Sequence, residues 1–364
     1  MITDWESSSS EILLNPRLDA KKRTRIASLL PCLGDFAAHI WIATSGSTNK
    51  NPLQDKFVAL SKQAVLASAA AVNRHLSCIK ADVWLNPLPD FHVGGLGISA
   101  RSYLTGSHMV RMSEWDPLEF HVLAEKHAVT LSALVPAQLF DLVSRKMKAP
   151  ASLRGIVIGG GALNEELYQK AKELEWNVLP SYGMTECASQ VATASVDDAS
   201  LTILDHVKLK MDVKGFICLK SASLLTSYAF VTGDGVELYD PKVEGWLTTQ
   251  DKGVVESGCL KMSGRLDDFI KIGGESVLFS RLEAIFEQSK LKLDYAEDCA
   301  IFACPDERLG CVVHLAAIDG DVQELIACYN GEVLPFERIR ETRIVEKLPR
   351  SPLGKLLKAQ LLKI

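Results

Sequence analysis

The sequence predicts a mixed α/β fold in which helices cover largely parallel β-sheets. In the first half of the chain, short apolar runs alternate with amphipathic stretches of helical period. Residues 201–263 differ, because short Val-, Ile-, Leu- and Thr-rich runs are broken there by Gly, Asp and Pro. The chain has 364 residues, which is enough for two or three domains, and its 47% hydrophobic and 23% charged content is ordinary for a globular protein.

Strand and helix signals follow each other in order along the first half. Residues 38–44 and 153–161 are apolar runs that we interpret as buried strands, and the second ends in three glycines. Residues 61–76 form an alanine-rich helical stretch. A second helix is predicted over 117–127, where a proline stands at the first helical position. A third is predicted over 164–176, with an asparagine as its N-cap.

The second half predicts two kinds of structure. Residues 201–263 indicate an antiparallel, barrel-like β region. An α+β pattern follows, with a helix over 281–288 and strands over 299–304 and 311–318. A short basic helix is expected from Lys355 to the end.

Charge, cysteine usage and the N-terminus exclude several classes of protein. The net charge of −5 gives no basic character for nucleic acid, so we expect small-molecule partners. The nine cysteines form no Cys-x-x-Cys pair, which favours free thiols over a metal site or disulfides. The acidic, polar first residues do not resemble a secretory signal, and no apolar run approaches the ~20 residues of a membrane span. We therefore expect a cytoplasmic protein.

A small-residue loop follows the first predicted strand. It consists of Thr44, Ser45, Gly46, Ser47 and Thr48. Hydroxyls and exposed backbone N–H groups in such a loop can donate hydrogen bonds to phosphate oxygens. A plain turn of small residues explains the pentapeptide equally well.

A glycine segment at the end of a predicted strand offers a surface for a flat ring. Gly160, Gly161 and Ala162 stand between that strand and the next helix. Backbone without side chains allows a ring to approach closely. The alternative interpretation is a tight β–α turn.

The strongest signal is the run Ser181, Tyr182, Gly183, Met184, Thr185 and Glu186. An aromatic ring beside a glycine can stack on adenine. The Thr185 hydroxyl can bind a phosphate, and the Glu186 carboxylate can hold Mg²⁺. The alternative is a buried tyrosine next to a surface glutamate.

Three charged residues lie in further short motifs. Asp251 ends Gly-Trp-Leu-Thr-Thr-Gln-Asp, Arg265 lies in Gly-Arg-Leu-Asp-Asp, and Lys355 ends Leu-Pro-Arg-Ser-Pro-Leu-Gly-Lys. A carboxylate can accept hydrogen bonds from both ribose hydroxyls, and an ammonium can stabilise charge that shifts between oxygens. Each residue alone would be read as a solvated surface charge.

In this order, the motifs resemble those of the adenylate-forming superfamily of acyl-CoA synthetases, luciferases and peptide-synthetase adenylation domains. The resemblance implies that the loop from Thr44 binds ATP phosphates, that the glycine segment lines the adenine pocket, and that Asp251 binds the ribose. It also implies that Arg265 contacts the nucleotide, and that Lys355 activates a carboxylate with ATP and Mg²⁺.

The resemblance further implies two domains. Residues 1–266 would form the adenylation core, and residues 267–364 a small mobile domain that carries the catalytic lysine. Asp267 matches the hinge position of the family. Gly273 and Gly274 would approach the CoA arm during thioester formation, although a β-turn between two strands is the alternative there.

The phosphate loop departs from the family pattern. Asn49 replaces a glycine that usually follows the pentapeptide, which asparagine can mimic because it tolerates positive φ. Lys56 is the candidate for the displaced phosphate-binding lysine, and Lys50 is its competitor.

Residues 86–97, 134–139 and 181–193 resemble segments of the o-succinylbenzoate–CoA ligases of menaquinone biosynthesis. Their substrate carries two carboxylates, and Arg101 stands where this branch places a substrate-contacting arginine, which can bind the second carboxylate bidentately. A surface salt bridge is the alternative for Arg101. The branch also points to His92, Ser189 and Thr193 as acyl-site residues, with a structural role as the alternative for His92.

The phosphate loop begins at residue 44, whereas in relatives it comes well over a hundred residues into the chain. We therefore expect a shortened N-terminal subdomain, an active enzyme, and a homodimer or substitute partner over the apolar surface this leaves. Two other functions remain open. One is an acyl-CoA synthetase for another aromatic or medium-chain acid. The other is a degenerate nucleotide-binding protein without turnover.

Overall fold

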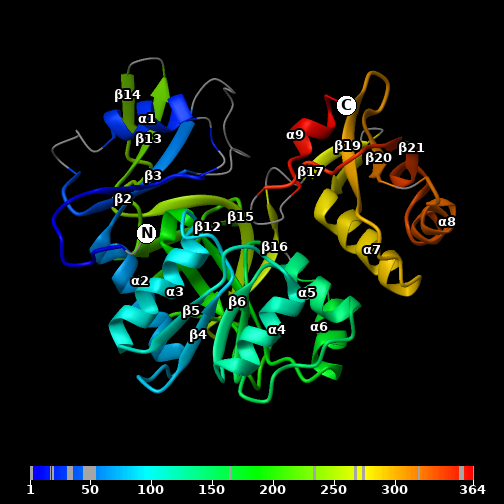
Figure 1. Ribbon diagram of the computed structural model, residues 1–364. Helices are drawn as coiled ribbons and strands as arrows, with labels where there is room; N and C mark the ends of the chain where they lie inside the picture. Colours follow the sequence, from blue (N-terminus) through cyan, green and yellow to red (C-terminus); the bar gives the residue numbers. More distant parts are fainter. Residues whose placement is uncertain are drawn as a thin grey trace.

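The structure is a computed structural model organised around three β-sheets (Figure 1). It describes residues 3–16, 18, 20–30, 36–43, 55–161, 163, 165–232, 235–265, 269–272, 275–318, 320–351 and 356–363. An eleven-stranded sheet and a five-stranded sheet make up the larger part of the molecule, and a second five-stranded sheet forms a smaller unit near the C-terminus. The mixed α/β fold predicted from the sequence is confirmed.

Half of the large sheet is parallel and covered by helices, as the alternating pattern predicted. Its order is β8 (Val178–Met184), β7 (Gly155–Ile158), β6 (Leu131–Leu134), β4 (Val83–Asn86) and β5 (His108–Arg111). The helices of this region are α3 (Val93–Thr105), α4 (Pro117–Lys126), α5 (Pro136–Ser144) and α6 (Glu165–Glu173). Parallel strands end at one edge of a sheet, so the polar segments that follow them are gathered there.

Helix boundaries follow the capping residues in the sequence. Ser61 caps α2 (Lys62–His75), and its hydroxyl accepts a hydrogen bond from the backbone of Ala64. Asp116 caps α4 in the same way, with Pro117 in the first turn. The N-cap predicted at Asn164 lies outside the described residues.

The other half of the large sheet is antiparallel, which confirms the antiparallel pairing predicted for residues 201–263. Its strands are β9 (Ser189–Thr193), β10 (Leu201–Ile203), β16 (Cys259–Arg265), β15 (Leu247–Glu256), β12 (Phe216–Ser221) and β11 (Val207–Met211). The antiparallel pairing of β8 with β9 joins the two halves into one continuous sheet. The motif 181–186 therefore lies where the sheet changes from parallel to antiparallel.

The hairpin of β13 (Ser227–Thr232) and β14 (Gly235–Tyr239) does not belong to that sheet, although it lies within the same part of the sequence. It joins β1 (Glu11–Leu13), β2 (His39–Ala43) and β3 (Asp55–Ser61) in the five-stranded sheet. Strand β13 pairs with β3, so Lys56 lies opposite Phe230. Helix α1 (Ala20–Leu29) contributes buried residues to a core with these strands.

The small C-terminal unit is an α+β structure. Its strands are β17 (Phe269–Ile272), β18 (Glu275–Leu278), β19 (Cys299–Asp306), β20 (Gly310–Ala317) and β21 (Ile339–Ile344), and its helices are α7 (Phe279–Lys292), α8 (Gln323–Glu332) and α9 (Lys358–Leu361). Helix α7 is longer than the predicted 281–288. The terminal helix begins at Lys358, not at Lys355, because the chain before it pairs Arg350 with Leu356 in a β-bridge.

Helix α7 also contacts the larger unit, as Figure 1 shows beside α5 and α6. Leu291, near its C-terminal end, belongs to the hydrophobic cluster of α4, α5 and α6. The Lys170 ammonium on α6 donates a hydrogen bond to the Leu291 carbonyl at 3.2 Å. Within the described part of the chain, no helix is long and apolar enough to cross a membrane.

Candidate active site

The turn after β8 is set by a close approach of two backbone segments. A Cβ on Gly183 would lie 2.0 Å from the Ser189 carbonyl oxygen, so only glycine fits at this position. The short 3₁₀ turn η2 (Thr185–Cys187) follows, and then Ala188 and Ser189 adopt positive φ values of 54° and 136°. Such backbone strain is held by its surroundings and is concentrated at functional sites. Glu186 lies in this turn, between β8 and β9.

Tyr182 and Asp251 are brought together, although they are far apart in sequence. The Tyr182 hydroxyl donates a hydrogen bond to Asp251 Oδ2 at 2.8 Å. Burial, followed by the negative charge of Asp251, raises the pKa of Tyr182. The Asp251 backbone N–H donates to Thr249 Oγ1 at 3.0 Å, and Asp251 is the register partner of Arg265 on β16. Asp251 and Arg265 thus lie on neighbouring strands, and the Tyr182 hydroxyl reaches Asp251 from β8, on the far side of β9 and β10 in the sheet order.

Glu186 is held by a residue that sequence reasoning missed. The Tyr228 hydroxyl on β13 donates to Glu186 Oε1 at 3.0 Å, and burial, then the Glu186 charge, raises the pKa of Tyr228. The Lys56 ammonium lies 3.7 Å from the centre of the Tyr228 ring and 4.0 Å from Glu186 Oε1. Lys56 is therefore a cation beside the predicted metal-binding carboxylate. Tyr228 lies in no motif, and only the pairing of β13 with β3 brings it here.

The glycine segment after β7 lies next to the start of the 181–186 motif. A Cβ on Gly159 would come 3.0 Å from Ser181 Oγ, and that hydroxyl donates to the Ile158 carbonyl at 3.1 Å. Gly160 has a φ of +79°, which disfavours any other residue. A Cβ on Gly160 would lie 3.4 Å from Val135 Cγ1, and one on Gly161 would lie 3.6 Å from Pro136 Cγ, at the start of α5. Their role in an adenine pocket stays a prediction.

Arg101 is a fully buried cation. It lies on α3, and only 1% of its surface is exposed. Its guanidinium lies 5.5 Å from the centre of the Trp84 ring. Its Nη2 atom donates to Ser189 Oγ at 3.4 Å, while Nε and Nη1 form no hydrogen bond with any described residue. Burial lowers the pKa of Arg101 to about 10.

The absence of a carboxylate beside Arg101, among the described residues, is unusual because a buried charge normally has a partner. The surface salt bridge weighed from the sequence does not fit a buried side chain. A Cβ on Gly97 would lie 3.1 Å from Arg101 Nη2, so glycine at 97 leaves room for the guanidinium. The arrangement can receive an anionic group.

His92 lies at the N-terminus of the same helix. Its Nε2 atom is buried and makes no hydrogen bond with the described residues, and burial lowers its pKa to about 4. The imidazole is therefore neutral at pH 7. The loop before it is fixed by Asn86, whose Nδ2 donates to the Gly95 carbonyl at 3.2 Å. A Cβ on Gly95 would come 2.5 Å from the Pro89 carbonyl oxygen.

Of the other acyl-site candidates, Ser189 contacts Arg101, whereas Thr193 is at the opposite end of β9. The Thr193 hydroxyl donates to Gln190 Oε1, and its register partner is Ser181. Some predicted site residues lie outside the described residues: Thr44, Ser45, Gly46, Ser47, Thr48, Lys50, Ala162, Asp267, Gly273, Gly274 and Lys355. Lys355 stands between two residues that are joined by a backbone hydrogen bond: the Leu357 N–H donates to the Pro349 carbonyl at 2.8 Å.

The fold and this grouping of residues define the class of protein. Residues 31–228 match the family model described as AMP-binding enzyme. The chain belongs to this family. The adenylate-forming resemblance of the motifs is thereby confirmed.

Similar proteins point to one branch of the family. The chain is 29% identical over 314 residues to a 2-succinylbenzoate–CoA ligase of Bacillus pumilus. The aligned region covers 81% of this chain and 63% of that protein. It is 28% identical over 341 residues to the ligase of the same name in Bacillus mycoides. That aligned region covers 89% of this chain and 69% of the relative. The chain thus spans about two thirds of the length of these relatives.

Solved structures share the fold. The o-succinylbenzoate CoA synthetase of Bacillus subtilis in complex with the acyl-adenylate intermediate matches with a TM-score of 0.73 at 24% identity, over 88% of this chain and 68% of that one. The same enzyme with ATP and a magnesium ion matches with a TM-score of 0.71 at 24% identity, over 89% of this chain and 70% of that one. The cytoplasmic location and the homodimer stay predictions.

Proposed function

We propose that this protein is an AMP-forming acid–CoA ligase that activates o-succinylbenzoate. Membership of the AMP-binding enzyme family supports the reaction class. The names of the relatives support the acid. The reaction has two steps, in which a carboxylate first becomes an acyl-adenylate and then a thioester of CoA.

The observation that carries the choice of acid is the buried guanidinium of Arg101. A dicarboxylic substrate presents one carboxylate to ATP and needs a fixed cation for the other. Arg101 has two nitrogen atoms without a described partner, and Ser189 lies beside it. A monocarboxylic acid would leave this charge buried and unpaired, which is costly. The site therefore favours a diacid.

For adenylation, we assign nucleotide binding to the Tyr182–Asp251 pair and phosphate binding to Lys56. A substrate carboxylate oxygen attacks the α-phosphorus of ATP and pyrophosphate leaves, with Lys355 stabilising the charge at the reacting oxygens. The Glu186 carboxylate fits Mg²⁺, because Mg²⁺ prefers oxygen ligands and Tyr228 fixes the orientation of this one. When bound, Mg²⁺ would neutralise charge on the phosphates.

For the second step, the CoA sulfur attacks the acyl carbonyl, the thiol proton is lost, and AMP leaves. We assign to residues 267–364 a rotation about Asp267 that withdraws Lys355 and brings Gly273 and Gly274 to the acyl group. No covalent enzyme intermediate is needed, so catalysis rests on positioning and charge stabilisation.

The test is AMP release with ATP, CoA and a panel of carboxylic acids that includes o-succinylbenzoate. We expect turnover with the diacid, and Arg101→Leu should raise its KM at least about tenfold, as expected for a lost charged hydrogen bond of ~1.4 kcal/mol or more. Monoacids serve as the control, since their KM should change little.

Two results would overturn the proposal. If Arg101→Leu raises KM equally for diacids and monoacids, the guanidinium does not select the second carboxylate. If the protein binds ATP but releases no AMP with any acid, it is a nucleotide-binding protein without turnover. Lys355→Ala tests the assigned step, because it should abolish adenylation while thioester formation from supplied acyl-adenylate persists.

A further inference from the structure

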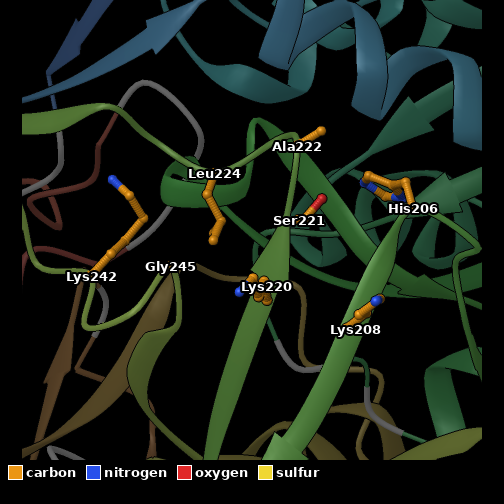
Figure 2. A pocket seen from close by; sticks show the side chains of 8 residues that line it. All are labelled: His206, Lys208, Lys220, Ser221, Ala222, Leu224, Lys242 and Gly245. Carbon is orange, nitrogen blue, oxygen red and sulfur yellow. The ribbon is translucent and has the colours of Figure 1, made fainter.

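The antiparallel half of the large sheet contains a cavity of about 430 Å³, which is large enough for a small ligand (Figure 2). It lies against strands β11 and β12 and the turn after β14. Its lining is His206, Lys208, Lys220, Ser221, Ala222, Leu224, Lys242 and Gly245. None of these eight residues carries a carboxylate, and none belongs to the candidate active site.

Two lysines of the lining oppose each other across the strands. Lys208 on β11 is the register partner of Lys220 on β12, so the two side chains project from the same face of the sheet (Figure 2). Like charges in directly opposed positions are destabilising. The Lys220 ammonium donates one hydrogen bond, to the Glu244 carbonyl at 3.1 Å, which leaves two of its three N–H groups. An anion between the lysines would relieve their repulsion.

His206, immediately before β11, adds buried ring nitrogens that have no hydrogen-bond partner among the described residues. Both ring nitrogens are shielded from solvent, and neither forms a hydrogen bond with any described residue. Burial lowers the pKa of His206 to about 4, so the neutral ring keeps one N–H donor at pH 7. An unsatisfied buried donor is destabilising, and a ligand oxygen would satisfy it.

The carboxylates of Asp240 and Asp205 bind side chains other than those of Lys208 and Lys220. The Lys242 ammonium donates to Asp240 Oδ1 at 2.7 Å and to the Leu225 and Thr226 carbonyls, so only the stem of Lys242 lines the cavity. Asp205, next to His206, accepts two hydrogen bonds from Arg74 at 2.7 and 2.8 Å. Lys208 and Lys220 are thus not neutralised by these two acids.

We propose that this cavity binds the phosphate group of a small molecule. The ammonium groups of Lys208 and Lys220 compensate its charge, and the His206 N–H donates a further hydrogen bond. Leu224, Ala222 and the lysine stems provide an apolar wall for the rest of the ligand. The site is separate from the proposed ligase chemistry and does not depend on it.

The test is a titration with inorganic phosphate, followed by NMR of protein with ¹³C-labelled histidine. The His206 signal is assigned by its loss in His206→Asn. We expect a saturable shift of this signal, and about tenfold weaker phosphate binding in the double variant K208Q/K220Q, equivalent to ~1.4 kcal/mol. Lys214→Gln is the matched control, because Lys214 is exposed in the β11–β12 turn outside the cavity, and it should bind as the parent does.

Sodium acetate at equal ionic strength separates phosphate recognition from general screening, and it should produce little shift. The proposal is overturned if the shift is linear and unsaturable, if acetate reproduces it, or if K208Q/K220Q binds phosphate as tightly as Lys214→Gln. AMP release by K208Q/K220Q should be unchanged, so a failed ligase assay and a failed phosphate titration are separate results.

Discussion

Tyr228 links the two charged side chains on the phosphate side of the candidate site. Its hydroxyl holds Glu186, and its ring lies under the Lys56 ammonium. Tyr228→Phe keeps the ring and removes the hydrogen bond, which is worth about 0.5–1.5 kcal/mol. If Glu186 acts through Mg²⁺, the variant should need a several-fold higher Mg²⁺ concentration for half-maximal AMP release, with little change in KM for the acid.

The matched control is Tyr239→Phe. The Tyr239 ring stacks on Tyr228 at 6.4 Å, and its side chain is 55% exposed, so this change alters the neighbourhood without touching Glu186. Equal Mg²⁺ dependence in Tyr228→Phe and Tyr239→Phe would argue against a positioning role for Tyr228.

His92 and His206 make stability depend on pH. Burial lowers both pKa values from 6.5 to about 4, so the unfolded chain binds protons at a higher pH than the folded one. Their contribution to stability is complete above pH ~6.5 and is lost as the pH falls toward 4, at no more than about 1.4 kcal/mol per pH unit for each group. Urea unfolding between pH 7 and 4 should therefore give a flatter profile for His92→Phe than for the parent. An identical slope in both would show that His92 does not titrate as described.

At the scale of elements, the turn from β8 to β9 depends on one glycine. Gly183→Ala would place a Cβ 2.0 Å from the Ser189 carbonyl, which is backbone and cannot rotate away. We expect a loss of several kcal/mol in the free energy of unfolding, as for other overpacked sites, together with loss of AMP release. Gly331→Ala is the control, since nothing lies within 4 Å of a Cβ there, on α8. Wild-type stability in Gly183→Ala would contradict the close approach of these strands.

Elements with local signals were predictable from the sequence, and long-range pairings were not. Ser61 and Asp116 mark helix starts because their side chains bond to the next turn. Motif order grouped Tyr182 with Asp251, and the structure joins them by a hydrogen bond. Tyr228 was missed because its role arises from the pairing of β13 with β3, more than 160 residues apart, and no local pattern encodes that register.

At the scale of the whole molecule, the proposed two-step reaction requires the small unit to leave one docked position and adopt another. In the structure it is held through the end of α7. Leu291 is 8% exposed within the cluster of the larger unit, and the Lys290 ammonium lies 5.2 Å from the Phe140 ring. Interfaces between domains of one chain commonly permit relative motion, which suits a docked position that is reversible.

Leu291→Ala should therefore loosen the docking without unfolding either unit. Leu282 and Phe286, on the inward face of α7, remain in the core of the small unit, so that unit keeps its packing. Small-angle X-ray scattering should show a larger radius of gyration. The rates of adenylation and thioester formation should change by different factors, because a single docked position cannot serve both steps. Leu293→Ala is the matched control, since Leu293 is 40% exposed at the end of the same helix. If Leu291→Ala leaves both the radius of gyration and the ratio of the two rates unchanged, this contact does not govern the position of the small domain.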